Sequence, residues 1–224
     1  MTSGTSPKNT AKIKAVLLDF DGTLVYKDIL DVVCGIVGKE EESDRINKDF
    51  HAGKLSGLTP LITRINFLKG VSLSQIQKKL NENAYLVTGA KNLLDFLNQK
   101  QIVTILNSGN ITPVLEYYQK LLGISYIVGT QPKMNNDIIE GIAEEDFPGR
   151  QFKVIGVKRI LDQLSIAPQD TLAIGDSPAD KTMFELAGAS IAINAKNGVE
   201  QFATFVIQND LTKAIPIIEE INKT

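Results

Sequence analysis

The stretch AVLLDFDGTL, residues 15–24, gives the first indication of the fold of this chain. Its apolar residues predict a strand that is buried on both faces and that delivers two carboxylates, Asp19 and Asp21, at its carboxyl end. A carboxylate without a partner at the edge of a low-dielectric core is costly in free energy. We therefore expect a divalent cation beside this strand end.

Composition limits the classes of protein that this chain can be. With 43% hydrophobic residues among 224, it can form one large domain or one domain with an insertion. The net charge of −2 gives no reason to expect nucleic acid or a membrane as a partner. Cys34 is the only cysteine, so no intrachain disulfide can form, which fits the cytoplasm. Residues 1–12 are expected to be a flexible lead-in, and no apolar run approaches the roughly 20 residues of a membrane span.

Residues 28–84 show only helical periodicity. Four short helices without a strand predict a small all-helical cap domain, inserted into a core formed by residues 1–27 and 85–224. Because the insertion follows the acidic strand directly, we expect the cap to lie above the carboxyl end of that strand as a lid.

Helices and strands alternate regularly from Thr88 onward, which predicts a parallel sheet covered on both faces. Residues 129–151 carry few apolar positions and are interpreted as a hairpin or a loop. The expected fold class is α/β, with a Rossmann-like, doubly wound parallel sheet as the core and an inserted helical cap.

Polar residues mark three expected strand ends: Asp19 with Asp21, Ser108 in an exit turn at 107–109, and Asp176. Ligands of open parallel sheets bind outside these ends. Three carboxylates suit Mg²⁺, and a carboxylate beside a metal can attack phosphorus, so Asp19 is a candidate nucleophile. The charge next to Asp21 favours its protonated form, which makes it a candidate acid and base.

Four stretches resemble the motifs of the haloacid dehalogenase superfamily of phosphotransferases. They are DFDGTL at 19–24, Ser108 with Gly109, Lys153, and GDSPAD at 175–180. The resemblance implies that Asp19 is the nucleophile, that Asp21 is the general acid and base and offers its backbone carbonyl to Mg²⁺, and that Asp176 is a metal ligand. It also implies that Ser108, Gly109 and Lys153 bind phosphate, and that Asp180 holds Lys153 and metal-bound water.

The helical insertion is similar to the lid of the phosphoserine phosphatase branch. In that branch, the positions that resemble Asp28 and Arg64 bind the amino and carboxylate groups of the substrate. The chain departs from the branch at Asp28, usually Glu, and at Asn110, usually a second Gly. It departs further at Gly57, near a position that is usually bulky and apolar, and at Ala179, usually Asn.

The leading hypothesis is a Mg²⁺-dependent phosphatase that hydrolyses a small phosphomonoester through a covalent aspartyl phosphate. Phosphoserine is one candidate substrate, and another small phosphorylated metabolite is the alternative. A non-catalytic module that keeps the fold to bind a metal or a partner stays an alternative. Asp21 argues against a dehalogenase or an ATPase-like transfer. Two residues also have a simpler structural interpretation: Ser108 could cap the following helix, and Lys153 could be a solvated surface lysine. His51 and Cys34 are interpreted as packing or surface residues.

Overall fold

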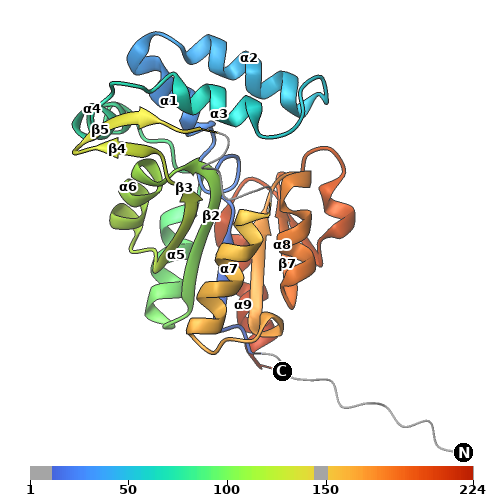
Figure 1. The fold of residues 1–224 in the computed structure, drawn as a ribbon. Coiled ribbons are helices and arrows are strands. Elements are labelled where there is room, and N and C mark those ends of the chain that lie inside the picture. The colour runs from blue at the N-terminus through green and yellow to red at the C-terminus, as the bar shows by residue number, and fades with distance from the viewer. Residues whose placement is uncertain (1–11, 144–150, 224) are drawn as a thin grey trace, which may run out of the picture.

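The computed structural model describes residues 12–143 and 151–223, and its centre is a six-stranded parallel sheet in the order β3-β2-β1-β6-β7-β8 (Figure 1). The six strands are β1 Ala15–Leu18, β2 Val103–Ile111, β3 Tyr126–Thr130, β6 Thr171–Gly175, β7 Ala189–Ile193 and β8 Phe205–Ile207. Strand β1 is fully buried and pairs with β2 on one side and β6 on the other. The predicted α/β class is confirmed, and the acidic stretch leaves the middle of the sheet.

Helices cover both faces of the sheet because the side chains of β1 alternate between two apolar clusters. Val16 and Leu18 belong to the cluster of α5 Ala90–Gln99, α6 Thr112–Leu122 and α9 Ala214–Lys223. Ala15 and Leu17 belong to the cluster of α7 Phe152–Gln163 and α8 Lys181–Leu186. Such double coverage explains why β1 reads as an uninterrupted apolar run.

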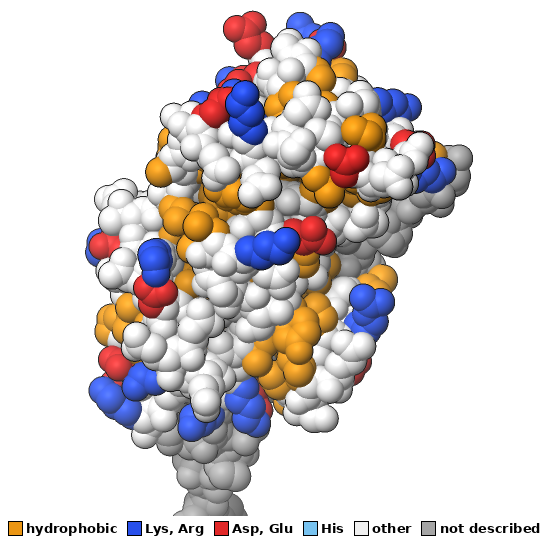
Figure 2. Space-filling view, turned by 90° about the vertical axis from the view of Figure 1, so that its left-hand side faces the viewer, with side chains coloured by type: hydrophobic (Ala, Val, Ile, Leu, Met, Phe, Trp, Pro, Cys, Tyr) orange, Lys and Arg blue, Asp and Glu red, His pale blue; other side chains and the backbone are white. Residues whose placement is uncertain are grey.

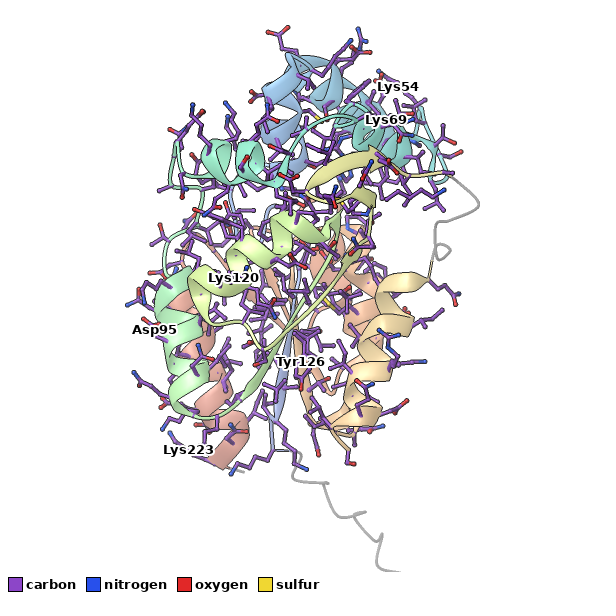
Figure 3. All side chains as sticks on the ribbon, turned by 60° about the vertical axis from the view of Figure 1, so that its left-hand side comes forward. Lys54, Lys69, Asp95, Lys120, Tyr126 and Lys223 are labelled. Carbon is purple, nitrogen blue, oxygen red and sulfur yellow. The ribbon has the colours of Figure 1, made fainter. Side chains whose placement is uncertain are left out.

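Four helices follow β1, as predicted, and lie beyond the carboxyl end of the sheet (Figure 1). They are α1 Ile29–Cys34, α2 Glu40–His51, α3 Thr59–Asn66 and α4 Leu73–Leu80. In Figure 3, Lys54 and Lys69 mark this end of the molecule and Lys223 marks the opposite end. We call this helical part the cap; its predicted limits, 28 and 84, stay a prediction.

A hairpin from the core part of the chain joins the cap. Strands β4 Lys133–Asn135 and β5 Ile138–Gly141 form it, and the N–H of Gly70 donates to the carbonyl of Ile139 at 2.8 Å. The predicted excursion at 129–151 is therefore a hairpin that packs on the cap, while residues 144–150 lie outside the described residues. The cap region is thus built from two stretches that are distant in the sequence.

The exit turn expected at 107–109 is wrong, because β2 continues through these residues to Ile111. The pairing of β2 with β3 shifts register between Asn107 and Ile111. A bulge of this kind absorbs the irregularity and lets the strand continue. Ser108 and Gly109 therefore lie inside an extended strand rather than after it.

Figure 2 shows hydrophobic side chains along the boundary between the cap and the core. A groove of about 470 Å³ lies there between α4 and α6, and Leu73 and Leu121 on its walls are exposed. Within the described residues, no helix has the length and apolar character that crossing a membrane requires.

Candidate active site

The turn after β1 places Asp19 and Asp21 at the edge of the sheet. The N–H of Asp19 still donates to the carbonyl of Ile174 on β6, at 2.9 Å, so Asp19 continues the strand. Gly22 then turns the chain with φ of +91°, and a Cβ there would overlap the carboxylate of Asp176. Only glycine combines this backbone conformation with so close an approach.

Strand β6 delivers a second pair of carboxylates. Asp176 follows the strand directly, and Asp180 ends the short 3₁₀ helix Pro178–Asp180. One oxygen of Asp180 accepts hydrogen bonds from the backbone N–H groups of Asp176, at 3.0 Å, and Ser177, at 3.1 Å. This arrangement positions Asp180 inside the loop that carries Asp176.

Asp19, Asp176 and Asp180 each offer a carboxylate oxygen within 4.8 Å of the other two, and all three side chains are buried. Burial, and then the charge of Asp180, raise the pKa of Asp19 well above its ordinary value. Oδ1 of Asp180 is buried without a hydrogen-bond partner among the described residues. Buried carboxylate oxygens, one of which has no hydrogen-bond partner, are ligands that fit a hard divalent cation such as Mg²⁺.

Lys153 from α7 supplies one ammonium group to this cluster. Its Nζ donates to Oδ1 of Asp19 at 3.3 Å and lies 3.9 Å from Oδ1 of Asp180. Burial opposes its ionisation, but the neighbouring carboxylates raise the pKa of Lys153 overall. Lys158 of the same helix is exposed, so the plainer reading of a solvated lysine fits Lys158 and not Lys153.

Asp21 has different surroundings from Asp19. Its carboxylate accepts from the N–H of Ile29 at 2.8 Å and from Nδ2 of Asn110 at 3.3 Å. Burial, and then the charge of Asp28, raise the pKa of Asp21 to about 8. The direction agrees with the sequence-based argument, although the charge with the larger effect comes from Asp28 and not from the nearby Asp19.

Ser108 faces this carboxylate from β2. It is buried, its Oγ donates to Oδ2 of Asp21 at 3.4 Å, and it accepts from the N–H of Asn110 at 3.0 Å. Helix α6 begins at Thr112 without a side-chain cap, so Ser108 does not cap it. The side chain is therefore available at the site.

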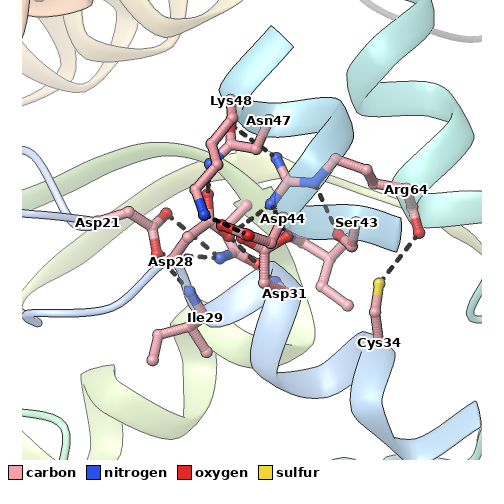
Figure 4. Close-up of polar contacts among 12 residues, drawn as sticks. Asp21, Asp28, Ile29, Asp31, Cys34, Ser43, Asp44, Asn47, Lys48 and Arg64 are labelled. Carbon is pink, nitrogen blue, oxygen red and sulfur yellow. Dashed lines mark hydrogen bonds and ion pairs between the residues drawn. The ribbon is translucent and has the colours of Figure 1, made fainter. Parts of the chain in front are cut away.

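Arg64 lies at the centre of a polar network inside the cap (Figure 4). Its NH2 group donates to Asp28 at 2.5 Å and to Asp31 at 2.9 Å, and its Nε donates to Ser43 at 2.9 Å. NH1 donates to Asn47 at 3.3 Å. Arg64 is 5% exposed, and its guanidinium group joins α1, α2 and α3.

A pocket of about 220 Å³ connects the cap to the carboxylates. Asp28, Arg64 and His51 line it from the cap, opposite Asp19 and Ser108 of the core. Gly57, Asn110 and Ala179, where the chain departs from the resembled branch, line it as well. His51, interpreted from the sequence as a packing or surface residue, is exposed and borders this pocket.

Lys196 is a site residue that sequence reasoning missed. It follows β7, and its Nζ donates to Oδ2 of Asp176 at 2.6 Å. Its position on the loop after a strand of the same sheet was the available signal, because all such loops meet at one edge. Asn110 stands out in the sequence only as a departure from the resembled branch, and its spacing does not predict the hydrogen bond to Asp21.

Comparisons with known proteins agree with this geometry. The family model described as haloacid dehalogenase-like hydrolase matches residues 16–185. A phosphoserine phosphatase of Campylobacter jejuni subsp. doylei is 28% identical over 92% of this chain and 100% of its own length. A phosphoserine phosphatase of Methanocaldococcus jannaschii is 27% identical over 93% of this chain and 99% of its own length.

Solved structures give the same result. A substrate-bound phosphoserine phosphatase matches with a TM-score of 0.79 and 26% identity, over 92% of this chain and 98% of its own. A phospho-aspartyl intermediate analogue of phosphoserine phosphatase matches with a TM-score of 0.77 and 27% identity, over 92% and 99%. These structures share the arrangement of sheet and cap over nearly the whole chain.

Proposed function

Since the chain belongs to the haloacid dehalogenase-like hydrolase family and is a hydrolase of the phosphatase type, we propose that it cleaves a small phosphomonoester through a covalent aspartyl phosphate. The observation that carries this proposal is the pocket in which Asp19, Asp21 and Ser108 face one another. Asp19 is the nucleophile, and Asp21 is the acid and base.

In the first step, a carboxylate oxygen of Asp19 attacks phosphorus and the bond from phosphorus to the leaving oxygen breaks. Asp21 gives its proton to that oxygen, so an alcohol leaves. The buried surroundings of Asp21 support this role, because they raise its pKa to about 8 and keep a proton on it near neutral pH.

In the second step, water attacks the aspartyl phosphate. Asp21, now ionised, takes a proton from the water, and the bond from phosphorus to the Asp19 oxygen breaks. Phosphate leaves and both carboxyl groups return to their starting states. Lys153, 3.3 Å from Asp19, and Ser108 with the backbone of Gly109 are positioned to balance charge on the phosphoryl oxygens.

Asp19 and Asp176 are the proposed ligands of Mg²⁺, together with the backbone carbonyl of Asp21, and Asp180 lies in the same cluster. When bound, the ion would neutralise charge on the phosphoryl group and reduce its repulsion by the carboxylates. Lys153 and Asp180 keep Asp19 oriented within the cluster.

Phosphoserine is the first substrate to test, because the reported relatives and structures are named for it. Asp28 and Arg64 line the pocket, and from the resemblance we infer that they face the amino and carboxylate groups of this substrate.

A second candidate is a small phosphomonoester without a carboxylate. Arg64 already donates to Asp28, Asp31, Ser43 and Asn47, so a substrate carboxylate would have to compete for its N–H groups. An ester whose leaving group carries an amine or hydroxyl groups would need only hydrogen-bond acceptors in the pocket, such as the carboxylate of Asp28.

The mechanism is tested with an aryl phosphate, with Mg²⁺ and with chelator. Asp19→Asn is expected to lower kcat at least about 10³-fold and to prevent acid-stable phosphate labelling of the protein. Asp162→Asn, on the solvent side of α7, is the matched control. Hydrolysis that neither the chelator nor Asp19→Asn reduces would contradict this mechanism, whereas no hydrolysis by the wild type would favour the non-catalytic alternative.

The substrate is tested with phosphoserine, phosphoethanolamine and glycerol phosphate. Arg64→Lys is expected to raise KM for phosphoserine while sparing the aryl phosphate if phosphoserine is the substrate. Equal activity on the ester that lacks a carboxylate, with no selective effect of Arg64→Lys, would favour the second candidate.

A further inference from the structure

Lys196 supplies a second ammonium group at the site. We propose that Lys196 is a positioning residue that holds Asp176 in the metal-free enzyme and lowers the affinity for the divalent cation by competing for the same carboxylate. This inference rests on the metal ligands named in the proposed function, and it extends them to a residue outside the four motifs.

Two contacts fix Lys196 against Asp176. Its backbone N–H donates to the backbone carbonyl of Asp176 at 2.8 Å, and its Nζ donates to Oδ2 of the same residue at 2.6 Å. The Asp176 side chain is 2% exposed, whereas the Lys196 side chain is 57% exposed. The backbone contact anchors the loop, and the side chain reaches from solvent to a buried carboxylate.

Gly22 places this ammonium beside the acidic turn. A Cβ built on Gly22 would lie 2.9 Å from Nζ of Lys196 and would overlap Oδ2 of Asp176. Since Gly22 follows Asp21 directly, the ammonium lies within the loop cluster that the proposed metal ligands share. Lys153 approaches the cluster separately, through Asp19 and Asp180.

The charges of the site explain why both cations are useful. Six titratable side chains meet here: Asp19, Asp21, Asp176, Asp180, Lys153 and Lys196. With the proton on Asp21 that the proposed mechanism uses and the other five groups ionised, three carboxylates and two ammonium groups leave one net negative charge, which attracts a divalent cation. In the absence of that ion, the ammonium group of Lys196 compensates the negative charge of Asp176.

Competition follows from the geometry of the two cations. Mg²⁺ requires oxygen ligands at about 2.1 Å in a near-octahedral arrangement. An ammonium on the same oxygen would repel the ion at short range, in a site where burial weakens screening. Because most of the Lys196 side chain is in solvent, it can withdraw along its flexible stem while the backbone bond to Asp176 remains.

In the test, Mg²⁺ is titrated into the chelator-treated full chain, and the melting temperature is measured at each Mg²⁺ concentration. Lys196→Gln is expected to melt at a lower temperature than wild type in chelator. Its midpoint for stabilisation by Mg²⁺ is expected to fall about threefold to tenfold, because no ammonium has to be displaced. Lys196→Arg should keep the ion pair and a midpoint close to wild type, and Lys158→Gln, exposed on α7, is the control.

Each other outcome has a distinct meaning. A midpoint in Lys196→Gln that is unchanged or higher would show that the ammonium and the ion use different oxygens, and would overturn the inference. A raised KM for an aryl phosphate with an unchanged midpoint would assign Lys196 to the substrate instead. If Mg²⁺ does not stabilise wild type either, the metal ligands of the proposed function fail together with this inference.

Discussion

Asp19 and Asp21 are separated by one residue, but their carboxyl groups have different surroundings because each contacts different residues. Asp19 contacts Lys153, whereas Asp21 accepts from the N–H of Ile29 and from the amide of Asn110. The pKa values of both are raised, chiefly by burial. Two acids that follow the same strand can therefore hold different roles, since each contacts a different part of the fold.

Asn110 orients the carboxyl group of Asp21 and is 2% exposed. Asn110→Ala removes this bond, so proton transfer to the leaving oxygen should become less efficient. We expect kcat to fall about tenfold for an alkyl phosphate, which needs that proton, and less than about threefold for p-nitrophenyl phosphate, which does not. Steady-state kinetics on both substrates measures the ratio. Equal losses would mean that Asn110 supports the pocket in general and not Asp21.

Gly22 is required by both its backbone conformation and its neighbours. Gly22→Ala should lower the free energy of unfolding by more than about 2 kcal/mol and reduce activity, because the methyl group displaces Asp176. Urea unfolding and an aryl phosphate assay measure the two effects. Gly70→Ala is the matched control, with φ of +86° and open space around the Cβ, so it carries the backbone strain without the clash. Equal effects of the two variants would contradict the argument.

At the scale of elements, Arg64 holds α1, α2 and α3 together through buried polar groups. This network contains Asp31, for which burial, and then the charge of Asp28, raise the pKa to about 6. The folded protein therefore binds this proton more tightly than the unfolded chain does. The stability that the proton contributes is present below about pH 4 and is lost as the pH rises through about 6.

Asp31→Asn does not titrate, so the comparison isolates this effect. From about pH 4 to 7, we expect wild type to lose about 2 kcal/mol of unfolding free energy relative to the variant. Urea unfolding at several pH values measures the difference, with the exposed Asp95→Asn on α5 as the control. A constant difference between wild type and Asp31→Asn would contradict the pKa assignment.

At the scale of the whole molecule, Asn66 connects the cap to the core part of the chain. Its amide donates to the carbonyl of Ile142 at 3.0 Å and its oxygen accepts from the N–H of the same residue at 2.9 Å. This pair fastens the end of the β4–β5 hairpin to α3. The hairpin therefore adds a third link between the cap and the core, beside the two chain segments that enter and leave the cap.

Asn66→Ala should lower the unfolding free energy by about 1–3 kcal/mol, because two backbone groups lose their partner. Proteolysis within 133–142 should become faster. The control is Asn98→Ala, which loses a single bond of 3.4 Å outside the cap. Unchanged protease resistance in Asn66→Ala would show that the hairpin is held by apolar packing alone.

The amino-acid sequence alone predicts the buried strand, the regular alternation of helix and strand, and the acids Asp19, Asp21 and Asp176. These features are local, because the period of apolar residues reports burial and covalent order places the acids next to the strand. It also predicted a hairpin or loop at 129–151 and four helices at 28–84.

Tertiary contacts set which groups surround these acids. Sequence spacing does not predict that the charge of Asp28 raises the pKa of Asp21. Nor does it predict that Lys196 donates a hydrogen bond to Asp176, or that Arg64 forms its hydrogen bonds within the cap. The continuation of β2 past Ser108 likewise depends on its pairing with β3. All these contacts join residues that different segments bring together, and burial there raises the pKa of Asp21. Local patterns therefore predicted where the site lies, and long-range contacts set its electrostatics.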